Sequence, residues 1–390
     1  MIDLIIKQSV EKLEDYIIRS NYKGYDPYDV LKSPLFKLPI FNKNKWLRFG
    51  FQQLGKRLPF NIRPILFVPK GYNPVTLGLC IQAYSYLIET FTQKKEYYFK
   101  QIEYLIDELN KLIPKGYSGA CWGYDFDWEA RYSKIPAYQP TVVATGIITN
   151  ALYVAWQITK IDKCKDLILS ASKFVLNDLN RIPEDDTFCF SYSPFDKGKV
   201  FNASLKGIRL LAQAYSLNHD EKLRETAKEA IPFIIKYQQE NGSWNYSLSK
   251  TGGWIDNYHS GYVVDCLDEY INHTNDFVYK NNLLKGYKFY YANFFTKNNA
   301  PKFYSEKVLP IDCTAASQSL LTLSRFGDIE KAKQVAFWTI KNMQSKSGNF
   351  YFRKFKFYTV RTSFMRWSNA WMFVGLSYLL MNLKLDNKIN

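Results

Sequence analysis

The sequence Tyr237-Gln238-Gln239-Glu240-Asn241-Gly242-Ser243-Trp244 ends a predicted helix over 220–240 in a turn that contains glycine and tryptophan. Within that helix, apolar residues recur three or four positions apart from Leu223 to Ile234, which places them on one helical face. Similar aromatic turns follow other helical segments, at 119–124, 188–192, 302–304 and 348–352. Their spacing of roughly 45–65 residues is typical of a repeated pair of helices.

Helical periodicity continues along almost the whole chain, and strand-like alternation is confined to short runs, so we predict an all-α protein. The predicted helices form about six hairpins and a closing helix over 361–383. The hairpins pair 4–20 with 43–56, 76–92 with 95–113, 140–159 with 162–180, 202–217 with 220–240, 259–273 with 276–296, and 313–326 with 329–344. No linker of biased composition divides them, so we predict one domain over 1–390.

The two ends of the chain favour a closed ring over an open stack of hairpins. The closing helix carries Trp367, Trp371 and Phe373, and the first helix carries Leu4 and Leu13 on its apolar face. Neither helix has the polar outer face that terminal repeats need. We therefore predict an α/α toroid, in which one helix of each pair lies inside the ring and the aromatic turns gather at one rim.

The stretch 237–244 resembles the Gln–Trp repeat of the terpenoid cyclase and protein prenyltransferase toroids, in which a Gly-x-Trp turn packs on a helix that ends in glutamine. The chain as a whole is more similar to bacterial toroid proteins encoded with surface-polysaccharide biosynthesis genes. The segments that carry this similarity are Gly123-Tyr124-Asp125-Phe126-Asp127-Trp128, 254–262, Pro310-Ile311-Asp312 and 364–372. The resemblance implies a toroid fold and a place in polysaccharide biosynthesis, without naming a reaction.

Composition narrows the range of partners. The 390 residues include 17% aromatic side chains and carry a formal net charge of +16. A charge of this sign suits nucleic acid, an anionic membrane surface or an acidic glycan. Because the lysines are dispersed rather than clustered on one predicted face, we expect no nucleic-acid binding. Peripheral contact with an anionic membrane surface stays an expectation, and the oligomeric state is left open.

Signals for secretion, metal binding and nucleotide binding are lacking in the sequence. The first residues have no basic stretch followed by an apolar core, and no apolar run reaches the roughly 18 residues that span a membrane. The six cysteines are scattered, so we expect reduced thiols and a cytoplasmic protein, peripheral to the inner face of the membrane. With three histidines and no glycine-rich phosphate loop, we expect neither a metal nor a cofactor.

The densest polar cluster is at the predicted start of the helix over 259–273. There, His259 is a candidate general base, because the positive end of a helix favours a neutral imidazole. Tyr258 or Tyr262 would supply a proton, Trp254 would bind substrate, and Asp256 would act as an acid or base. The alternative for Asp256 is a helix cap.

A second cluster lies at 124–131. Asp125 and Asp127 are candidate acid and base, and Trp128 and Tyr124 could stack on a sugar ring or hydrocarbon, with Arg131 as a further substrate contact. Aromatic neighbours would supply the apolar setting that raises the pKa of a catalytic carboxylic acid. The structural alternative is a loop in which Asp127 pairs with Arg131.

Further candidates precede the last two inner helices. Asp312 is either a helix cap or a catalytic carboxylate. Arg361 and Arg366 could hold a carboxylate or phosphate, beside Trp367, whereas cation–π packing is the structural alternative for Arg366. An N-terminal loop is expected over the same rim, with Tyr25, Asp26 and Tyr28.

These residues favour a carbohydrate-active enzyme of the glycoside hydrolase, lyase or uronyl epimerase type. Its substrate would be an acidic or lipid-linked glycan in surface polysaccharide biosynthesis, processed by acid/base chemistry in the toroid mouth. For a uronate, Arg361 or Arg366 would neutralise the carboxylate; for a neutral glycoside, two of the four aspartates would act as a pair. The alternatives are a terpenoid cyclase or prenyltransferase, although the D-x-D-D acid of cyclases is absent, and a non-catalytic glycan-binding scaffold.

Overall fold

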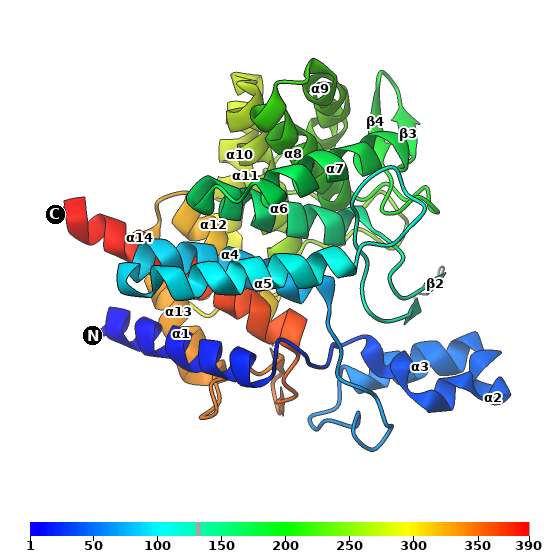
Figure 1. Ribbon diagram of the computed structural model, residues 1–390, viewed down its shortest axis with the longest axis vertical. Helices are drawn as coiled ribbons and strands as arrows, with labels where there is room; N and C mark the ends of the chain where they lie inside the picture. The colour runs from blue at the N-terminus through cyan, green and yellow to red at the C-terminus, as the bar shows by residue number, and fades with distance from the viewer. Residues whose placement is uncertain (130–133, 390) are drawn as a thin grey trace.

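The computed structural model describes residues 1–129 and 134–389 and shows many helices lying side by side (Figure 1). Their contacts arrange them in an inner and an outer layer. Each inner helix packs against the next, and the last packs against the first, so the inner layer is closed. The inner helices are α4 (Pro74–Thr90), α6 (Val142–Thr159), α8 (Phe201–Asn218), α10 (Asn257–Thr274), α12 (Cys313–Arg325) and α14 (Trp371–Ile389).

The outer layer covers this ring, one helix against each inner helix. Outer helices are amphipathic, whereas α4 and α6 are buried along nearly their whole length. By length and composition α6 could span a membrane, but most of its residues are enclosed by the ring. The outer helices are α5 (Lys95–Lys111), α7 (Asp162–Asn177), α9 (Glu221–Lys236), α11 (Lys280–Asn293), α13 (Ile329–Met343) and α1 (Ile2–Arg19).

The predicted all-α toroid is confirmed, but the pairing of 4–20 with 43–56 is wrong. The first helix, α1, packs against α14 and α13, so the N-terminal helix is the outer partner of the C-terminal one. Ile6, Val10, Leu13 and Ile17 form the buried stripe that makes this contact. The two ends of the chain thus complete one hairpin and close the ring.

The segment 43–56 belongs instead to a lobe, residues 30–71, that projects from one side of the ring (Figure 1). It contains α2 (Pro39–Asn42) and α3 (Lys45–Gly55) and two 3₁₀ turns, the first of which begins at Asp29. Phe36, Phe41 and Phe51 pack edge to face, with ring centroids 5.5–5.9 Å apart. This aromatic cluster gives the lobe a small core of its own.

Short antiparallel strands lie between the helices. They are β1 (Trp128–Glu129) with β2 (Lys134–Ile135), β3 (Arg181–Glu184) with β4 (Thr187–Phe190), and a sheet of β5 (Ile311–Asp312), β6 (Arg353–Lys354) and β7 (Thr359–Val360) in that order. The register of the sheet places Asp312 opposite Arg353. A π-helical turn over Met365–Ala370 precedes α14; such turns are frequent at functional sites.

The Gln–Trp turn at 237–244 joins neighbouring hairpins. Gln238 Nε2 donates hydrogen bonds to the carbonyl of Gly242, at 3.0 Å, and to that of Asn282 on α11, at 2.9 Å. Trp244 Nε1 donates to the carbonyl of Ile234 at 2.8 Å. Gly242 has a φ of +96°, and a Cβ there would lie 2.4 Å from the carbonyl oxygen of Lys285, so only glycine fits.

A second copy of this contact closes the ring. Gln344 Nε2 donates to the carbonyl of Gly348, at 2.9 Å, and to that of Ser9 on α1, at 3.2 Å. Gly348 has a φ of +98° and presses on the backbone of Lys12. Phe350 replaces the tryptophan, so the motif keeps its glutamine and glycine while its aromatic residue varies.

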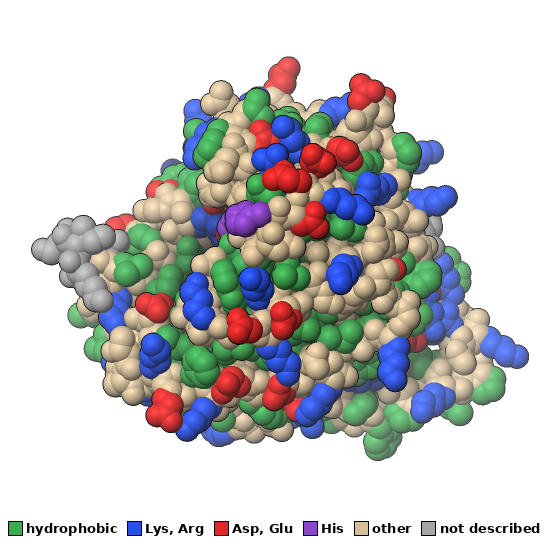
Figure 2. Space-filling model, turned by 45° about the horizontal axis from the view of Figure 1, so that its top comes forward, with side chains coloured by type: hydrophobic (Ala, Val, Ile, Leu, Met, Phe, Trp, Pro, Cys, Tyr) green, Lys and Arg blue, Asp and Glu red, His purple; other side chains and the backbone are tan. Residues whose placement is uncertain are grey.

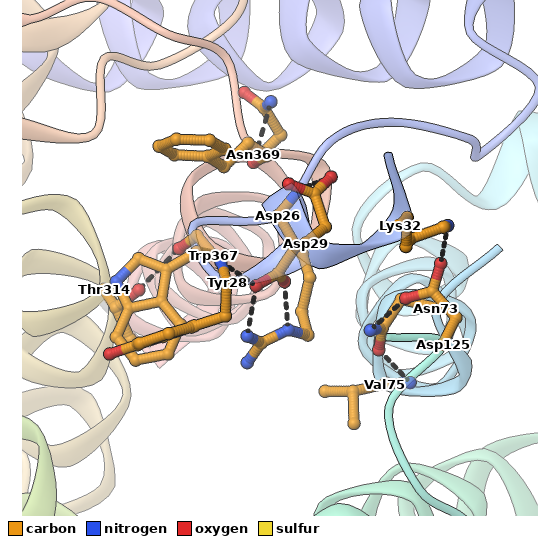
Figure 3. A network of polar contacts seen from close by, with 12 residues as sticks. Asp26, Tyr28, Asp29, Lys32, Asn73, Val75, Asp125, Thr314, Trp367 and Asn369 are labelled. Carbon is orange, nitrogen blue, oxygen red and sulfur yellow. Dashed lines mark hydrogen bonds and ion pairs between the residues drawn. The ribbon is translucent and has the colours of Figure 1, made fainter. Parts of the chain in front are cut away.

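An ion pair joins the N-terminal loop to the turn before α14. Arg366 Nε and Nη2 donate to the two carboxylate oxygens of Asp26 at 2.6 and 2.9 Å, and both side chains are buried. The same loop carries Asp29, which pairs with the buried Arg63, and Tyr28, whose ring lies 6.0 Å from that of Trp367 (Figure 3). This contact fixes the rim where the chain ends meet.

We expect Asp26→Asn to lower the free energy of unfolding by about 3–5 kcal/mol, because a buried guanidinium loses its counter-charge. Urea denaturation followed by circular dichroism measures the change. The control is Asp15→Asn, an exposed acid on α1 for which a change within about 0.5 kcal/mol is expected. A loss below about 1 kcal/mol for Asp26→Asn would show that the pair does not hold the rim.

Glu14 on α1 gives a second prediction. It is 5% exposed, its Oε1 has no hydrogen-bond partner, and burial raises its pKa from 4.5 to about 7. The folded state therefore favours the protonated acid. The contribution of protonated Glu14 to the free energy of unfolding is present below about pH 4.5 and is lost as the pH rises through about 7. We expect Glu14→Gln to add about 2 kcal/mol at pH 8 and little at pH 4, measured by urea denaturation; an equal effect at both pH values would contradict it.

Candidate active site

A pocket of about 340 Å³ opens at the rim where the inner helices α6, α10 and α14 begin. This volume falls in the range of roughly 300–1,000 Å³ that small-molecule sites occupy. Most of the lining is aromatic, and the exceptions are Val143, Ile147, His259 and Arg366. The lining includes eight residues predicted from the sequence: Tyr124, Trp128, Trp254, Tyr258, His259, Tyr262, Arg366 and Trp367.

Asp256 and His259 form a hydrogen-bonded pair at the edge of this pocket. Asp256 caps α10, because its Oδ1 accepts the backbone N–H of His259 at 3.0 Å. Its Oδ2 lies 2.7 Å from His259 Nδ1 and also accepts from Trp254 Nε1 at 2.9 Å. The capping role and the site role of Asp256 are therefore compatible. With Nδ1–H donated to the carboxylate, Nε2 is the basic nitrogen, and it has no partner among the described residues.

Three tyrosine rings surround His259. The rings of Tyr258, Tyr246 and Tyr262 have their centroids 4.1, 4.6 and 6.0 Å from the imidazole. Burial raises the pKa of Tyr258 and of Tyr262 well above the ordinary value of 10, so both phenols keep their protons. Neither hydroxyl makes a hydrogen bond to another described residue. Both are therefore available as donors to a ligand.

The charge of Arg366 is already balanced. Its guanidinium packs against the rings of Tyr124 and Trp367, at 4.7 and 4.9 Å from their centroids. Asp26 accepts the hydrogen bonds from Nε and Nη2. Burial lowers the pKa of Arg366, but Asp26 and the neighbouring Tyr124 and Tyr28 together raise it above its ordinary value, so the group stays charged. The cation–π packing expected as the structural alternative is therefore present, with Asp26 as the counter-charge, and among the described contacts only Nη1 has no hydrogen-bond partner.

The other predicted carboxylates do not line the pocket, although Asp312 accepts a hydrogen bond from the lining residue Trp367 at 3.3 Å. Asp312 is fully buried, where it caps α12 and accepts two hydrogen bonds from Arg353 at 2.6 and 2.9 Å. Asp125 pairs with Lys32 at 2.8 Å and with Asn73 at 2.8 Å (Figure 3). Asp127 pairs with Lys134 at 3.0 Å. Asp125 and Asp127 face a different cavity, beside the lobe, so no pair of carboxylates lines the aromatic pocket in the described residues.

Of the two remaining predicted residues, the structure describes only Arg361, which does not line the pocket. The guanidinium of Arg361 lies over the ring of Tyr351, at 5.7 Å, and its backbone N–H meets the carbonyl of Pro59. Arg361 is exposed and is not among the residues that line the pocket. Arg131, and with it the suggested pair with Asp127, lies outside the described residues.

Sequence reasoning missed several lining residues. Tyr192 and Tyr246 belong to two of the aromatic turns that the sequence placed at the rim, but neither was named as a site residue, and Tyr246 stacks on Trp254 at 4.5 Å. Their position, next to the start of an inner helix, is the signal that could have identified them. Lys206 gave no such signal. It is buried beneath the pocket with Nζ 3.6 Å from the ring centroid of Tyr262, and burial lowers its pKa to about 7.

Comparison with known proteins shows the fold. No protein-family profile and no curated protein matches this chain. Among solved structures, cellobiose 2-epimerase from Bacillus thermoamylovorans B4167 is similar at 13% identity and a TM-score of 0.59, over 81% of this chain and 90% of that one. An unsaturated glucuronyl hydrolase specific for heparin is similar at 12% identity and a TM-score of 0.62, over 99% and 98%.

The GH76 α-mannanase of Bacteroides thetaiotaomicron is similar at 12% identity and a TM-score of 0.57, over 80% of this chain and 87% of that one. Identities this low carry no activity from one protein to another. These proteins share the architecture of the ring described above, and this chain is an α/α toroid.

Proposed function

We propose that this protein is a carbohydrate-active enzyme that binds a sugar unit in the aromatic pocket and moves a proton with His259. The observation that carries the proposal is the Asp256–His259 pair, which leaves a basic Nε2 at a pocket enclosed by aromatic rings. Aromatic faces pack on the C–H faces of sugars, and the tyrosine hydroxyls donate to sugar oxygens. The enzymes of similar fold named above, an epimerase, a glucuronyl hydrolase and a mannanase, are consistent with this choice.

The arrangement favours removal of a proton from carbon over hydrolysis by two carboxylates, because a glycosidase pair must flank one bond. In the favoured reaction, His259 Nε2 takes the proton of a carbon next to a carbonyl or carboxylate, and the C–H electron pair forms an enolate. In an epimerisation, Tyr258 or Tyr262 returns a proton to the opposite face of that carbon. In an elimination, the neighbouring C–O bond breaks and the departing oxygen takes that proton.

The substrate class follows from charge and is part of the proposal. Arg366 Nη1 and the phenols would donate hydrogen bonds to a carboxylate or enolate oxygen, although Asp26 already balances the arginine charge. We propose an acidic or lipid-linked glycan of surface polysaccharide biosynthesis, met at the cytoplasmic face of a membrane. The resemblance noted in the sequence supports the pathway, and the net charge of +16 supports an anionic substrate.

One observation favours a terpenoid cyclase or prenyltransferase as the second candidate: aromatic rings of this density also stabilise carbocations by cation–π attraction. A prenyltransferase zinc site would use His259 and Cys313. Within residues 1–129 and 134–389, no three His, Cys, Asp or Glu side chains come together as metal ligands. Stoichiometric zinc in the purified protein would favour this candidate.

The test of the proton transfer uses His259→Gln, with His219→Gln, an exposed histidine at the end of α8, as the matched control. Uronate-containing and lipid-linked oligosaccharides are incubated with the protein in D₂O, and nuclear magnetic resonance follows deuterium entering a sugar C–H position. We expect exchange or product with the wild type and with His219→Gln, and a loss of about 10²–10⁴-fold with His259→Gln. Turnover that His259→Gln leaves unchanged would overturn the proposal, and saturable binding without turnover would establish the scaffold instead.

Asp256→Asn tests the orientation of the imidazole. Three N–H groups, from His259 Nδ1, the His259 backbone and Trp254, converge on the carboxylate, and an amide must turn its own NH₂ toward one or two of them. The favoured relief moves the histidine proton to Nε2 and removes the base. We expect kcat to fall by roughly 10²-fold or more with a smaller change in KM. Equal loss of kcat and stability, with normal activity in the folded fraction, would contradict this role.

A further inference from the structure

We propose that the lobe, residues 30–71, is a membrane-docking element that binds the anionic surface of a lipid bilayer. This inference goes beyond the reaction in the pocket, because it concerns where the protein is held and does not depend on which residues move protons. It is carried by three features of the lobe: its charge, its exposed apolar side chains, and the rigid way in which these are held outward.

Charge is concentrated in the lobe more strongly than the dispersed lysines suggested. From Val30 to Gly71 the chain has nine Lys and Arg and no Asp or Glu, which is more than half of its net charge of +16. Three of these cations bind the lobe to carboxylates at its base: Lys32 to Asp125, Arg48 to Glu129 and Arg63 to Asp29. The others have no carboxylate partner among the described residues: Lys37, Lys43, Lys45, Lys56, Arg57 and Lys70.

Large apolar side chains are exposed among these cations. Ile40, Trp46, Ile65 and Phe67 are each between 66% and 74% exposed, and Leu38, Leu54 and Phe60 are about half exposed. Blue and green side chains cover the projecting lobe at the lower right of Figure 2. Basic residues interleaved with exposed aromatic and aliphatic ones are typical of segments that lie in a bilayer interface, with cations at the headgroups and apolar groups below them.

Buried contacts hold the apolar tip in place. Arg63 is fully buried and donates to Asp29, to the carbonyl of Gly55 at 3.1 Å and to that of Asp26 at 2.6 Å. The turn that follows it is closed by hydrogen bonds from the backbone N–H of Phe67 and of Val68, and Phe67 has a φ of +53°. A bulky residue adopts this backbone only under constraint. Phe67 is therefore held outward rather than being free to fold back.

The lobe lies beside the mouth of the pocket. Gln52 on α3 donates to the backbone carbonyls of Tyr28 and Asp127, at 2.7 and 3.3 Å, and Lys56 lies 4.7 Å from the ring of Tyr28. Tyr28 and the neighbour of Asp127, Trp128, line the pocket. The β6–β7 hairpin, in whose turn Phe357 is 88% exposed, is joined to the lobe at its end, where the backbone N–H of Arg361, directly after β7, donates to the carbonyl of Pro59. A docked lobe thus brings the pocket mouth near the lipid headgroups.

The first test measures the electrostatic part. The full chain is sedimented with vesicles of phosphatidylcholine alone or with roughly one third phosphatidylglycerol, whose anionic surface attracts each nearby cation. We expect binding only to the anionic vesicles, and its loss between about 0.1 M and about 1 M salt, as the Debye length falls from about 10 Å to about 3 Å. The triple variant K37Q/K43Q/K70Q should bind roughly 100-fold more weakly.

The matched control for charge is K222Q/K228Q/K285Q, which removes three exposed lysines from α9 and α11. Because these lysines lie outside the lobe, we expect this control to bind like the wild type. Equal weakening by the two triple variants would overturn the proposal, since it would show that net charge alone, rather than the lobe, drives binding. Circular dichroism on heating checks that all variants are folded.

The second test measures insertion. Bromine-labelled lipids quench tryptophans that enter the bilayer, so we expect quenching in the wild type and its loss in Trp46→Phe. The pair I65N/F67N should weaken binding at least 10-fold, because asparagine tolerates the backbone of residue 67 while removing the apolar side chain. The control F277N/V278N removes an exposed apolar pair near the start of α11. Undiminished binding of I65N/F67N would overturn insertion of this tip.

Two other binding partners of the lobe would contradict the proposal: nucleic acid and a second copy of this chain. Tighter binding to single- or double-stranded nucleic acid than to anionic vesicles, lost in K37Q/K43Q/K70Q, would identify a nucleic-acid surface. A concentration-dependent dimer in analytical ultracentrifugation that I65N/F67N abolishes, with no vesicle binding, would identify an interface with a second copy of this chain.

Discussion

The buried ion pair between Asp26 and Arg366 is the constraint on which the pocket depends. The two residues are 340 positions apart, and a bidentate contact between them is the condition under which both charges can leave water. Their neighbours Tyr28 and Trp367 are brought together as a consequence and form one wall of the pocket. Asp29 with Arg63 and Asp312 with Arg353 repeat the arrangement nearby. The rim is thus assembled by charged pairs, whereas the ring beneath it is held by apolar packing.

The ring could be predicted because the residues that define its helices and turns lie close together in the sequence. Apolar spacing marks each helix, and Gln238 with Gly242 marks the junction to the next hairpin, a contact that Gln344 and Gly348 repeat. The partner of α1 could not be predicted in the same way. An apolar stripe shows that a helix must be covered, but it does not show by what, and the covering helices α13 and α14 come more than 300 residues later.

The site was predictable in part for a related reason. Asp256 and His259 lie three positions apart at a helix start, so their contact follows from helix geometry. For Asp125 and Asp312, a loop sequence does not show the direction of a side chain. Their cationic partners, Lys32 and Arg353, come from distant segments that only the fold brings close. Tyr192 and Tyr246 were not singled out because the aromatic residues of such turns serve either in packing or at the rim, and only their position next to the start of an inner helix distinguishes the two roles.

The pairing of the first helix with the last also determines when the fold can be completed. During synthesis α1 leaves the ribosome before the other helices of the ring, yet α13 and α14, whose surfaces cover it, follow all the rest. Its apolar stripe therefore stays uncovered until α13 and α14 have been synthesised, and the seam that contains Gln344 and Ser9 is the last junction of the ring to form. A chain released before Trp371 would have all of its outer helices but would lack the inner helix α14, so α1 would have no inner partner and the ring would stay open.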